Sequence, residues 1–428
     1  MDTNIGEIPV ENYPRIVIIG GGFAGITLAK TLKNKKVQIL MLDKNNYHTF
    51  QPLLYQVATA GLEPDSIAYP IRKIFKGQSD FIFRMAEVLN IRPETNSIET
   101  SIGKIDFDYL VIASGSKTNF YGLEDMKANA VPMKSVPEAL DLRSLILQNL
   151  EKALLTSDIK ERERLMNIVV VGGGPTGVEI AGALGELKKH ILPSDYPELD
   201  TRQMHIYLIE ALDRLLISMS IDASKKAVDF LEELGINVWL NTGVKSYDGS
   251  NIILTNGKTL TTHNLIWSAG VMGATIQGIN ENLITHGNRI KVDYFNRLEG
   301  SKNIFAIGDV AAMISKEFPN GFPMLAPVAI QQAENLATNI IKLINKEEMK
   351  PFVYIDKGSM ATVGRNKAVA DLPNFKSQGV FAWFIWCFVH LMFLVGFRNK
   401  AVVFVNWVWS YFSYDRGIRL IIRPYKKN

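Results

Sequence analysis

Two stretches of the chain repeat one pattern of apolar and polar positions. Ile16–Ile19 and Ile168–Val171 are runs of four apolar residues, the length of a buried parallel strand. Each run leads into glycines at G-x-G-x-x-G spacing and then into residues with helical spacing. The next apolar strand ends on an acid, Asp43 in the first copy and Glu210 in the second. The pattern predicts two dinucleotide-binding βαβ units.

Each glycine has a physical task in this pattern. The first permits a tight turn, the second lets a diphosphate approach the backbone, and the third lets strand and helix pack closely. The diphosphate would lie on the free N–H groups at the start of the helix. A glycine-rich turn that binds nothing is the alternative, but the combination of strands, glycines, helix and acid favours a nucleotide site. The glycines are Gly20, Gly22 and Gly25 in the first copy and Gly172, Gly174 and Gly177 in the second.

The second acid indicates which nucleotide binds there. Glu210 follows its first glycine by 38 residues, against 23 in the first copy, and we attribute the excess to a loop over Leu192–Arg202. A carboxylate accepts both ribose hydroxyls of NADH and repels the 2′-phosphate of NADPH. Arg214 lies four residues on and leaves NADPH open as the alternative.

Two further strands end in small residues. Tyr109–Ile112 runs into Ala113, Ser114 and Gly115, which lets the backbone approach a bound ring or phosphate. Phe305–Ile307 is followed by Gly308 and Asp309, and this aspartate is well placed for a hydroxyl of a flavin side chain.

Composition and charge exclude several classes of protein. A chain of 428 residues with 47% hydrophobic residues can bury two or three domain cores. Residues 376–428 hold eight Lys or Arg and one acid, so they carry +7 and the remainder carries −3. A nucleic-acid binder would spread its basic residues over a folded face, so we expect no nucleic-acid partner. The single cysteine, Cys387, excludes a disulfide within the chain and a redox-active cysteine pair. No cluster of His, Asp or Glu has metal-ligand spacing, so we expect no metal.

The C-terminal tail is apolar and aromatic as well as basic. Gly379–Phe397 is nineteen residues interrupted only by His390, about 28 Å long as a helix at ~1.5 Å per residue. Ala401–Tyr414 is too short to cross a bilayer. Four of the six tryptophans lie in the tail, and tryptophan favours the membrane interface. We expect two amphipathic helices in the membrane surface; a single span and a buried dimer interface are the alternatives.

The whole chain resembles the two-dinucleotide flavoprotein reductases, and within them the type II NADH dehydrogenases (NADH:quinone oxidoreductases). The segments that carry the resemblance are Gly20–Gly25, Phe50–Ala58, Gly172–Glu179, Phe305–Val310 and the basic aromatic tail. The resemblance implies that NADH passes a hydride to FAD and that a membrane quinone, menaquinone or ubiquinone, is then reduced. It also implies a peripheral protein at the cytoplasmic face of the cell membrane, with a second copy of the chain as a candidate partner. We expect no proton pumping, since the sequence has no uninterrupted apolar run of eighteen or more residues.

The resemblance also implies roles for individual residues. FAD would be bound by Gly20, Gly22, Phe23, Ala24, Gly25, Asp43, Lys44, Gln51, Ala113, Ser114, Gly115, Gly308 and Asp309. NADH would be bound by Gly172, Gly174, Thr176, Gly177, Glu210 and Gly270. The quinone site would use Glu179 and Gln331, while Pro327 stands where the family has a first glutamine. The alternatives are a solvated Glu179 in a first helical turn and a Gln331 amide bonded to backbone. His48 and His390 are interpreted as structural.

We therefore expect an α/β chain of two doubly wound Rossmann-type domains with a C-terminal amphipathic helical tail. Residues 1–130 and 275–375 would form the FAD domain, 131–274 the NADH domain, and 376–428 the membrane-associated tail. Competing hypotheses are another membrane-associated FAD-dependent quinone or NAD(P)H reductase, and a non-enzymatic nucleotide-sensing flavoprotein. Turnover of NADH with a quinone separates the last of these from an enzyme.

Overall fold

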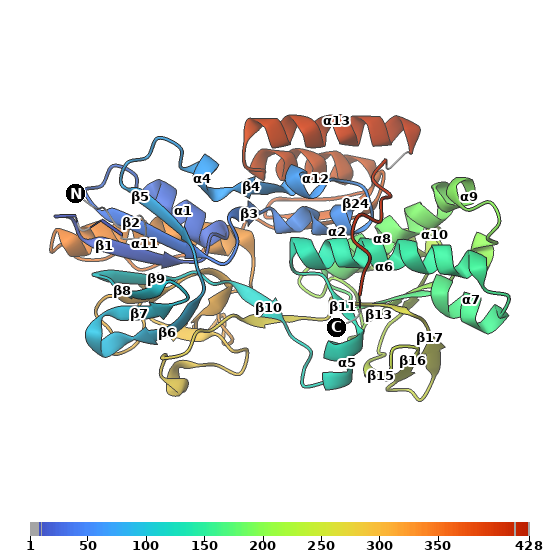
Figure 1. Cartoon of the computed structure of the whole chain (residues 1–428), viewed down its shortest axis with the longest axis horizontal. Coiled ribbons are helices and arrows are strands. Elements are labelled where there is room, and N and C mark those ends of the chain that lie inside the picture. Colours follow the sequence, from blue (N-terminus) through green and yellow to red (C-terminus); the bar gives the residue numbers. More distant parts are fainter. Residues whose placement is uncertain (1–7, 10, 415–416, 427–428) are drawn as a thin grey trace. The chain divides into compact units, whose positions relative to one another are not determined.

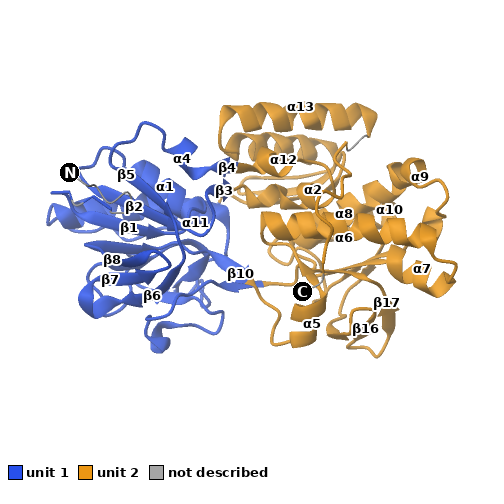
Figure 2. Ribbon diagram, viewed as in Figure 1, with its two compact units in different colours: residues 1–48, 69–117, 271–356 blue, residues 49–68, 118–270, 357–428 orange. Residues whose placement is uncertain are grey.

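The computed structural model describes residues 8–9, 11–414 and 417–426. Contacts divide the chain into unit 1, residues 1–48, 69–117 and 271–356, and unit 2, residues 49–68, 118–270 and 357–428 (Figure 2). The chain passes from one unit to the other within β3 (Tyr47–Thr49), β4 (Ala68–Pro70) and β10 (Ser116–Thr118), just before β19 (Val271–Gly273), and between Asp356 and Lys357. The domain boundaries expected from the sequence stay a prediction.

Unit 1 is built on a five-stranded parallel sheet in the order β21-β9-β1-β2-β5. Figure 1 labels β1, β2, β5 and β9 of this sheet. Alternate side chains of β1 point to opposite faces. Ile16 and Ile18 pack with α1 and α11, whereas Val17 and Ile19 pack with the antiparallel sheet β6-β7-β8. The elements are β1 (Arg15–Ile19), α1 (Phe23–Thr31), β2 (Gln38–Asp43), α4 (Ile71–Ile74), β5 (Phe81–Met85), β6 (Val88–Arg92), η2 (Pro93–Thr95), β7 (Ser97–Thr100), β8 (Gly103–Asp106), β9 (Tyr109–Ile112), η4 (Glu281–Leu283), β20 (Ile290–Val292), β21 (Ile304–Ala306), η5 (Gly308–Val310), β22 (Ala311–Met313) and α11 (Ala326–Ile344).

Unit 2 repeats this plan with the parallel sheet β11-β18-β12-β13-β14 and the antiparallel sheet β15-β16-β17. The repeat is permuted, because the edge strand β11 precedes β12 in the chain whereas its counterpart β21 comes late in unit 1. The elements are η1 (Gln51–Leu53), α2 (Leu54–Ala58), α3 (Pro64–Ile67), α5 (Glu124–Asn129), β11 (Val131–Pro132), α6 (Val136–Leu155), α7 (Ile159–Met166), β12 (Ile168–Val171), α8 (Pro175–His190), α9 (Leu192–Asp195), η3 (Thr201–Gln203), β13 (Ile206–Ile209), α10 (Ile221–Glu233), β14 (Ile236–Trp239), β15 (Val244–Tyr247), β16 (Asn251–Leu254), β17 (Thr259–Thr261) and β18 (Asn264–Trp267).

The expected loop over Leu192–Arg202 is only partly correct. The segment begins with one helical turn, α9, in which Leu192 is buried, and it ends in the 3₁₀ turn η3. Pro193 fits the first turn of α9 because its missing N–H has no helical partner there.

The C-terminal part of unit 2 is a small antiparallel sheet followed by two helices (Figure 1). The elements are β23 (Ser359–Gly364), β24 (Lys367–Leu372), β25 (Phe375–Gln378), α12 (Val380–Phe393) and α13 (Phe397–Ser413). The apolar run Gly379–Phe397 is therefore not one helix, since α12 ends at Phe393 and Gly396 has a φ of +85°. Within the described residues, no helix is both long and apolar enough to cross a membrane.

Candidate active site

The first glycine loop of unit 1 connects β1 to α1. Gly20 has a φ of +110°, and a Cβ there would lie 2.3 Å from the carbonyl oxygen of Ala113. A Cβ on Gly25 would lie 1.9 Å from the carbonyl oxygen of Gly20. Both positions exclude any larger residue, so the glycines allow β1, α1 and the end of β9 to meet.

The acid at the end of β2 holds this loop in place. The Asp43 carboxylate accepts hydrogen bonds from the Gly21 N–H at 2.6 Å and the Asn45 N–H at 2.7 Å. Burial raises the pKa of Asp43, and these two bonds oppose the rise. Lys44 is largely exposed and forms an ion pair with Glu87 at 2.6 Å.

A histidine also contacts this loop, through the carbonyl oxygen of Gly21. The His48 ring lies 3.0 Å, through Nδ1, from the Gly21 carbonyl oxygen and packs edge-on against Phe23, with ring centroids 5.1 Å apart. Because a carbonyl only accepts, Nδ1 carries the proton. Burial lowers the pKa of His48 to about 4, so the ring is neutral at physiological pH. Sequence reasoning treated His48 as structural and did not connect it to the predicted nucleotide loop.

The small residues after β9 form a second part of this site. The Ser114 hydroxyl donates to the Ala274 carbonyl at 2.6 Å, and the Gly115 carbonyl accepts from the Ala274 N–H at 3.0 Å. A Cβ on Gly115 would meet no atom within 4 Å, so the backbone borders open space there.

The turn after β21 is brought to the same region of unit 1. Ser116 donates to the Asp309 carboxylate at 2.6 Å, and the Gly308 N–H donates to the buried Gln332 side chain at 2.7 Å. A Cβ on Gly308 would be 3.4 Å from the Cβ of Ala24 at the start of α1. The sequence showed Gln332 as a polar residue inside an apolar helical run, but no role was predicted for it.

The glycine loop of unit 2 connects β12 to α8 in the same way. Gly172 has a φ of +110°, and a Cβ on Gly177 would lie 1.8 Å from the Gly172 carbonyl oxygen. The Glu210 carboxylate accepts from the Gly173 N–H at 2.5 Å and from the Leu212 N–H at 2.8 Å.

The Arg214 side chain is hydrogen-bonded within its own loop. Its guanidinium donates to the carbonyl oxygens of Met219 at 2.8 Å and Ile217 at 2.7 Å, and to the Ser224 hydroxyl at 2.9 Å. Three acceptors hold the guanidinium inside the segment between β13 and α10.

The other two residues predicted to bind NADH also lie in unit 2. Thr176 is exposed in the first turn of α8. Gly270 follows β18 and accepts from the Asn119 N–H at 3.0 Å; a Cβ there would lie 2.2 Å from the Tyr121 hydroxyl, so the exposed Tyr121 side chain would have to move.

Both loops fit a diphosphate. Gly22 and Gly174 are the N-caps of α1 and α8, and no described side chain caps either helix. A Cβ on either glycine would meet no atom within 4 Å, so an anion can approach the free N–H groups of the first turn. Among the described residues, no group of three or more His, Cys, Asp and Glu side chains could hold a metal ion.

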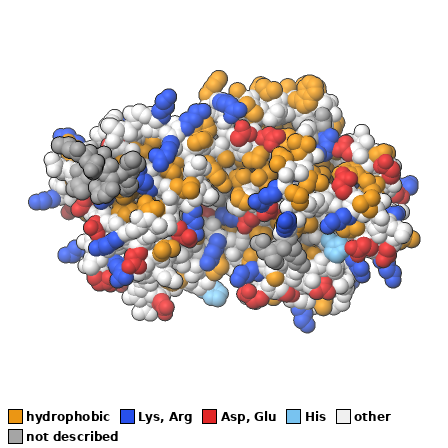
Figure 3. All heavy atoms as spheres, in the orientation of Figure 1, with side chains coloured by type: hydrophobic (Ala, Val, Ile, Leu, Met, Phe, Trp, Pro, Cys, Tyr) orange, Lys and Arg blue, Asp and Glu red, His pale blue; other side chains and the backbone are white. Residues whose placement is uncertain are grey.

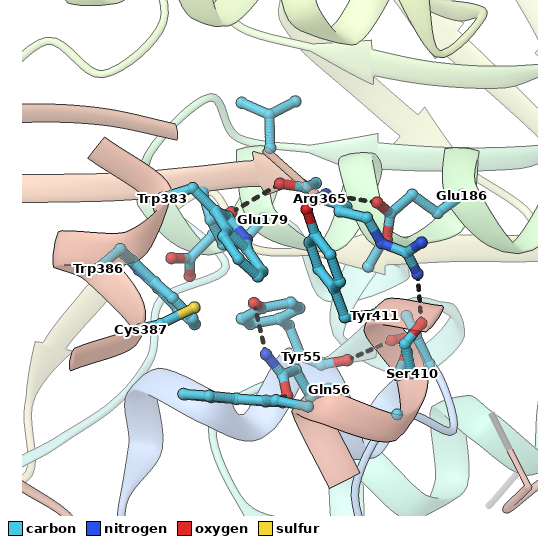
Figure 4. A pocket seen from close by; sticks show the side chains of 17 residues that line it. Tyr55, Gln56, Glu179, Glu186, Arg365, Trp383, Trp386, Cys387, Ser410 and Tyr411 are labelled. Atoms are coloured by element: carbon cyan, nitrogen blue, oxygen red, sulfur yellow. Dashed lines mark hydrogen bonds between the residues drawn. The ribbon is translucent and has the colours of Figure 1, made fainter. Parts of the chain in front are cut away.

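Unit 2 also contains a cavity of about 90 Å³ lined by α2, α8, the β23–β24 hairpin, α12 and α13 (Figure 4). Glu179, in the second turn of α8, lines it and is only 8% exposed. Glu179 is therefore not the solvated side chain of the alternative interpretation. Burial raises the pKa of Glu179 to about 8, opposed by the Thr362 backbone and the Trp386 side chain. The carboxyl thus holds its proton at neutral pH.

The cavity has polar groups that sequence reasoning did not assign. The Gln56 amide donates to the Tyr55 hydroxyl at 2.8 Å and accepts from the Trp407 indole at 2.8 Å. Both residues lie within the motif Phe50–Ala58, which was the available signal. Gln51, at the start of that motif, accepts from the Lys134 ammonium at 3.2 Å.

Gln331 lies on α11 in unit 1, with its side-chain amide bonded to backbone. Its Nε2 donates to the Ile355 carbonyl and its Oε1 accepts from the Ile355 N–H, both at 2.9 Å. Pro327 occupies the first turn of α11, where its missing N–H leaves no helical bond unmade.

The helices α12 and α13 expose many large apolar side chains (Figure 3). Trp386 and Val403 are buried in unit 2, but most of the remainder face outward. The exposed set is Val380, Phe381, Phe384, Phe388, Met392, Phe393, Phe397, Phe404, Val405, Val408, Trp409 and Phe412. Two basic side chains that follow are paired within unit 2, Arg419 with Asp195 and Arg423 with Asp141.

These features define a two-nucleotide flavoprotein reductase, and the comparisons agree. The pyridine nucleotide-disulphide oxidoreductase family model matches residues 14–333, and the NDH2 C-terminal domain model matches residues 357–413. The chain therefore has the α/β dinucleotide-binding flavoprotein fold.

Relatives narrow the class further. The chain is 33% identical to the type II NADH:quinone oxidoreductase Ndh of Mycobacterium tuberculosis over 94% of this chain and 89% of the relative. It is 34% identical to NdhA of the same organism over 94% and 88%. An NDH2 structure from Plasmodium falciparum in complex with NADH has a TM-score of 0.86 at 23% identity, covering 95% of this chain and all of that chain, which supports the fold. The chain belongs to the type II NADH:quinone oxidoreductase family, and the resemblance read from its motifs is confirmed.

Proposed function

We propose that this chain oxidises NADH and reduces a membrane quinone through bound FAD, without pumping protons. Similarity over nearly the full length to proteins named type II NADH:quinone oxidoreductase supports this pair of substrates. The observation that carries the proposal is a buried, protonated carboxyl, Glu179, in a cavity beneath two helices with exposed apolar faces.

FAD is assigned to unit 1 and NADH to unit 2. The loop of Gly20, Gly22 and Gly25 would hold the FAD diphosphate, with Asp43 and Asp309 at hydroxyl groups. The corresponding loop of unit 2 would hold NADH, with Glu210 at the ribose. Lys44, Gln51, Thr176 and Gly270 stay predictions as contacts at these sites.

NADH is favoured over NADPH for a reason visible in unit 2. A 2′-phosphate needs an arginine free to pair with it, and three acceptors already bind the Arg214 guanidinium. Glu210 adds a negative charge at the position a 2′-phosphate would approach.

FAD held by the glycine loop of unit 1 would supply the redox chemistry between NADH and the quinone. The chain contributes binding, orientation and a proton. Glu179 would deliver that proton to a quinone oxygen, since its pKa of about 8 keeps it protonated at neutral pH. Gln331 remains a proposed quinone contact, and its amide would have to leave the Ile355 backbone to reach one.

Glu179→Gln tests this function. The variant keeps the shape of the side chain and removes its acid, so we expect quinone reduction to slow by about 10²-fold, with flavin reduction by NADH unchanged. Stopped-flow bleaching and recovery of the flavin absorbance measure the two half-reactions, with menaquinone and ubiquinone analogues compared. The exposed α10 variant Glu232→Gln is the matched control. If both half-reactions of Glu179→Gln run at the wild-type rates, Glu179 does not deliver the proton.

The exposed faces of α12 and α13 are proposed to lie in the surface of the cell membrane on its cytoplasmic side. Exposed phenylalanine and tryptophan side chains of these helices favour the membrane interface. Arg398 pairs with Asp65 at 3.4 Å within unit 2, so the apolar side chains carry this proposal. A second copy of the chain is the other occupant that this apolar surface could accept.

Phe388→Glu combined with Phe412→Glu tests the membrane surface, because these side chains are 66% and 78% exposed. We expect the variant to stop sedimenting with phosphatidylglycerol vesicles while it keeps its flavin. Leu155→Glu combined with Ile159→Glu changes equally exposed residues elsewhere in unit 2 and should sediment normally. A dimer that dissociates in the Phe variant without loss of vesicle binding would favour the second copy instead.

A further inference from the structure

A stripe of three residues runs along the side of α8 that meets β23. Glu179, Gly182 and Glu186 are spaced i, i+3 and i+7, so they lie on one helix face. A Cβ on Gly182 would lie 1.7 Å from the Val363 carbonyl oxygen, so only glycine lets β23 contact the helix between the two acids. Seven residues at ~1.5 Å each place the acids about 10.5 Å apart along the helix axis.

Both carboxyl groups border the same cavity. Figure 4 shows Glu179 and Glu186 on opposite sides of Arg365 and Tyr411, and both acids line the volume of about 90 Å³. A space of this size has room for water. The hydroxyl of Tyr55 and the amide of Gln56 also line it, so water there would find hydrogen-bond partners.

The two acids differ in their access to solvent. Glu179 is 8% exposed, whereas Glu186, two turns further along α8, is half-buried. The Glu186 carboxylate accepts from the Arg365 backbone N–H at 2.5 Å, which fixes it at the β23–β24 turn. The guanidinium of Arg365 is directed away, to the carbonyl oxygen of Ser410 on α13. Glu186 thus lines the cavity and is more exposed than Glu179.

We propose that Glu186 takes up protons from solvent and passes them through cavity water to Glu179. This inference rests on the proposed function of Glu179. Overall, NADH and a quinone give NAD⁺ and a quinol, with one proton taken from solvent for two electrons transferred. That proton leaves the Glu186 carboxyl for water, water protonates the Glu179 carboxylate, and Glu179 delivers the proton to a quinone oxygen. Glu186 is then protonated again from solvent.

Other titratable groups facing the cavity do not serve this role. Burial raises the pKa of Tyr55 well above its ordinary value and the pKa of Cys387 to about 12, so both keep their protons at neutral pH. Tyr411 and Arg365 also line the cavity, and the Arg365 guanidinium donates to the Ser410 carbonyl oxygen. Among the described lining residues, the carboxyl groups are therefore the ones suited to exchange protons.

Glu186→Gln tests the proposal in the full-length, FAD-loaded protein. Glutamine keeps an acceptor for the Arg365 N–H and removes the acid. We expect flavin reduction by NADH to match wild type and flavin reoxidation by a soluble quinone to slow by about tenfold. We also expect a larger solvent deuterium isotope effect on reoxidation, and partial recovery with added formate, neither of which a purely structural role would produce. Glu232→Gln is again the control.

The outcomes separate this proposal from the function on which it rests. Slow reoxidation in Glu179→Gln with wild-type reoxidation in Glu186→Gln would overturn the role of Glu186 alone. Wild-type reoxidation in both variants would remove Glu179 and, with it, the pathway. If Glu186→Gln does not retain FAD, Glu186→Asp carries the test: a displaced carboxyl should slow reoxidation by about threefold and respond to formate. An Asp variant with wild-type rates and no formate response would contradict the proposal.

Discussion

The two glycine loops of this chain have the same backbone geometry, but different contacts hold them closed. Gly20 and Gly172 share a φ of +110°. A Cβ on the third glycine of either loop would lie less than 2 Å from the carbonyl oxygen of the first glycine. Asp43 accepts from the N–H of Gly21 and Glu210 from the N–H of Gly173, and each acid also accepts from an N–H two residues further along the chain. The repeated geometry explains why both loops are recognisable in the sequence.

The contact that closes each loop differs. The Gly21 carbonyl in unit 1 accepts from the buried His48 ring, whereas the Gly173 carbonyl in unit 2 accepts from the Leu216 N–H at 2.8 Å. A side chain therefore supports the first loop and a backbone segment, held by Arg214, supports the second. The loop of unit 1 therefore depends on one side chain, which a substitution can remove, whereas the loop of unit 2 is held by backbone.

The largest expected effects come from the third glycines. Gly177→Ala places a Cβ 1.8 Å from the Gly172 carbonyl oxygen, so the loop of unit 2 must open. We expect flavin reduction by NADH to fall by about 10²-fold or more, because the backbone cradle for the diphosphate is lost. Gly25→Ala, with 1.9 Å at the equivalent place, should instead yield protein without FAD.

Absorbance of the purified protein and stopped-flow reduction measure these effects. Reduction of Gly177→Ala by dithionite is the control, since it needs FAD but no nicotinamide site. A Gly177→Ala protein that loses FAD while Gly25→Ala keeps it would reverse the assignment of the two units.

A smaller effect is expected from the acid of unit 2. Glu210→Ala removes the acceptor for ribose hydroxyls, and a charge-assisted hydrogen bond contributes about 1.5–3 kcal/mol, so KM for NADH should rise by about tenfold or more. KM for NADPH should change less, because the repulsion of its 2′-phosphate disappears as well. Steady-state kinetics with both nucleotides measure the ratio. An unchanged preference would mean that Glu210 does not contact the ribose.

The sequence predicted the parts of this molecule whose physics is local. The glycines, the apolar strands and the acids after β2 and β13 lie within about 40 residues of one another in each unit, so spacing alone defined both loops. The order β11 before β12 could not be read in this way, because strand neighbours depend on long-range pairing.

The cavity shows where local patterns fail. Glu179 was recognised through its motif, but its burial depends on β23, α12 and α13, more than 170 residues away in the chain. Glu186 has no distinctive spacing, and its contact became visible only when Arg365 was placed beside it. Gln332 interrupts an apolar run, but its bond to the Gly308 N–H also depends on a distant segment. Residues whose roles depend on distant partners need the structure.

The smallest expected effects concern His48. His48→Ala leaves the Gly21 carbonyl without its buried donor, which costs about 1 kcal/mol and should weaken FAD retention by about fivefold. His48→Asn places an amide N–H near the position of Nδ1 and should retain FAD like wild type. FAD release during dilution, followed by flavin fluorescence, measures both variants. Equal retention in Ala, Asn and wild type would mean that the ring does not support the loop.

His48→Asn also isolates a pH effect of the same ring. The pKa of His48 is about 4 in the folded protein and 6.5 ordinarily, so the unfolded chain binds more protons between these values. The stability that this group contributes is present above pH 6.5 and is lost as the pH falls toward 4. His390, with its pKa lowered to about 4, also makes the folded protein less stable as the pH falls. Glu179, with its pKa raised from 4.5 to about 8, has the opposite effect, because its contribution to stability is lost as the pH rises through this range. The free energy of unfolding should therefore decline less steeply below pH 6.5 in His48→Asn than in wild type, by up to ~1.4 kcal/mol per pH unit. Parallel curves would show that His48 has the same pKa in both states, and the neutral ring inferred for the first loop would be wrong.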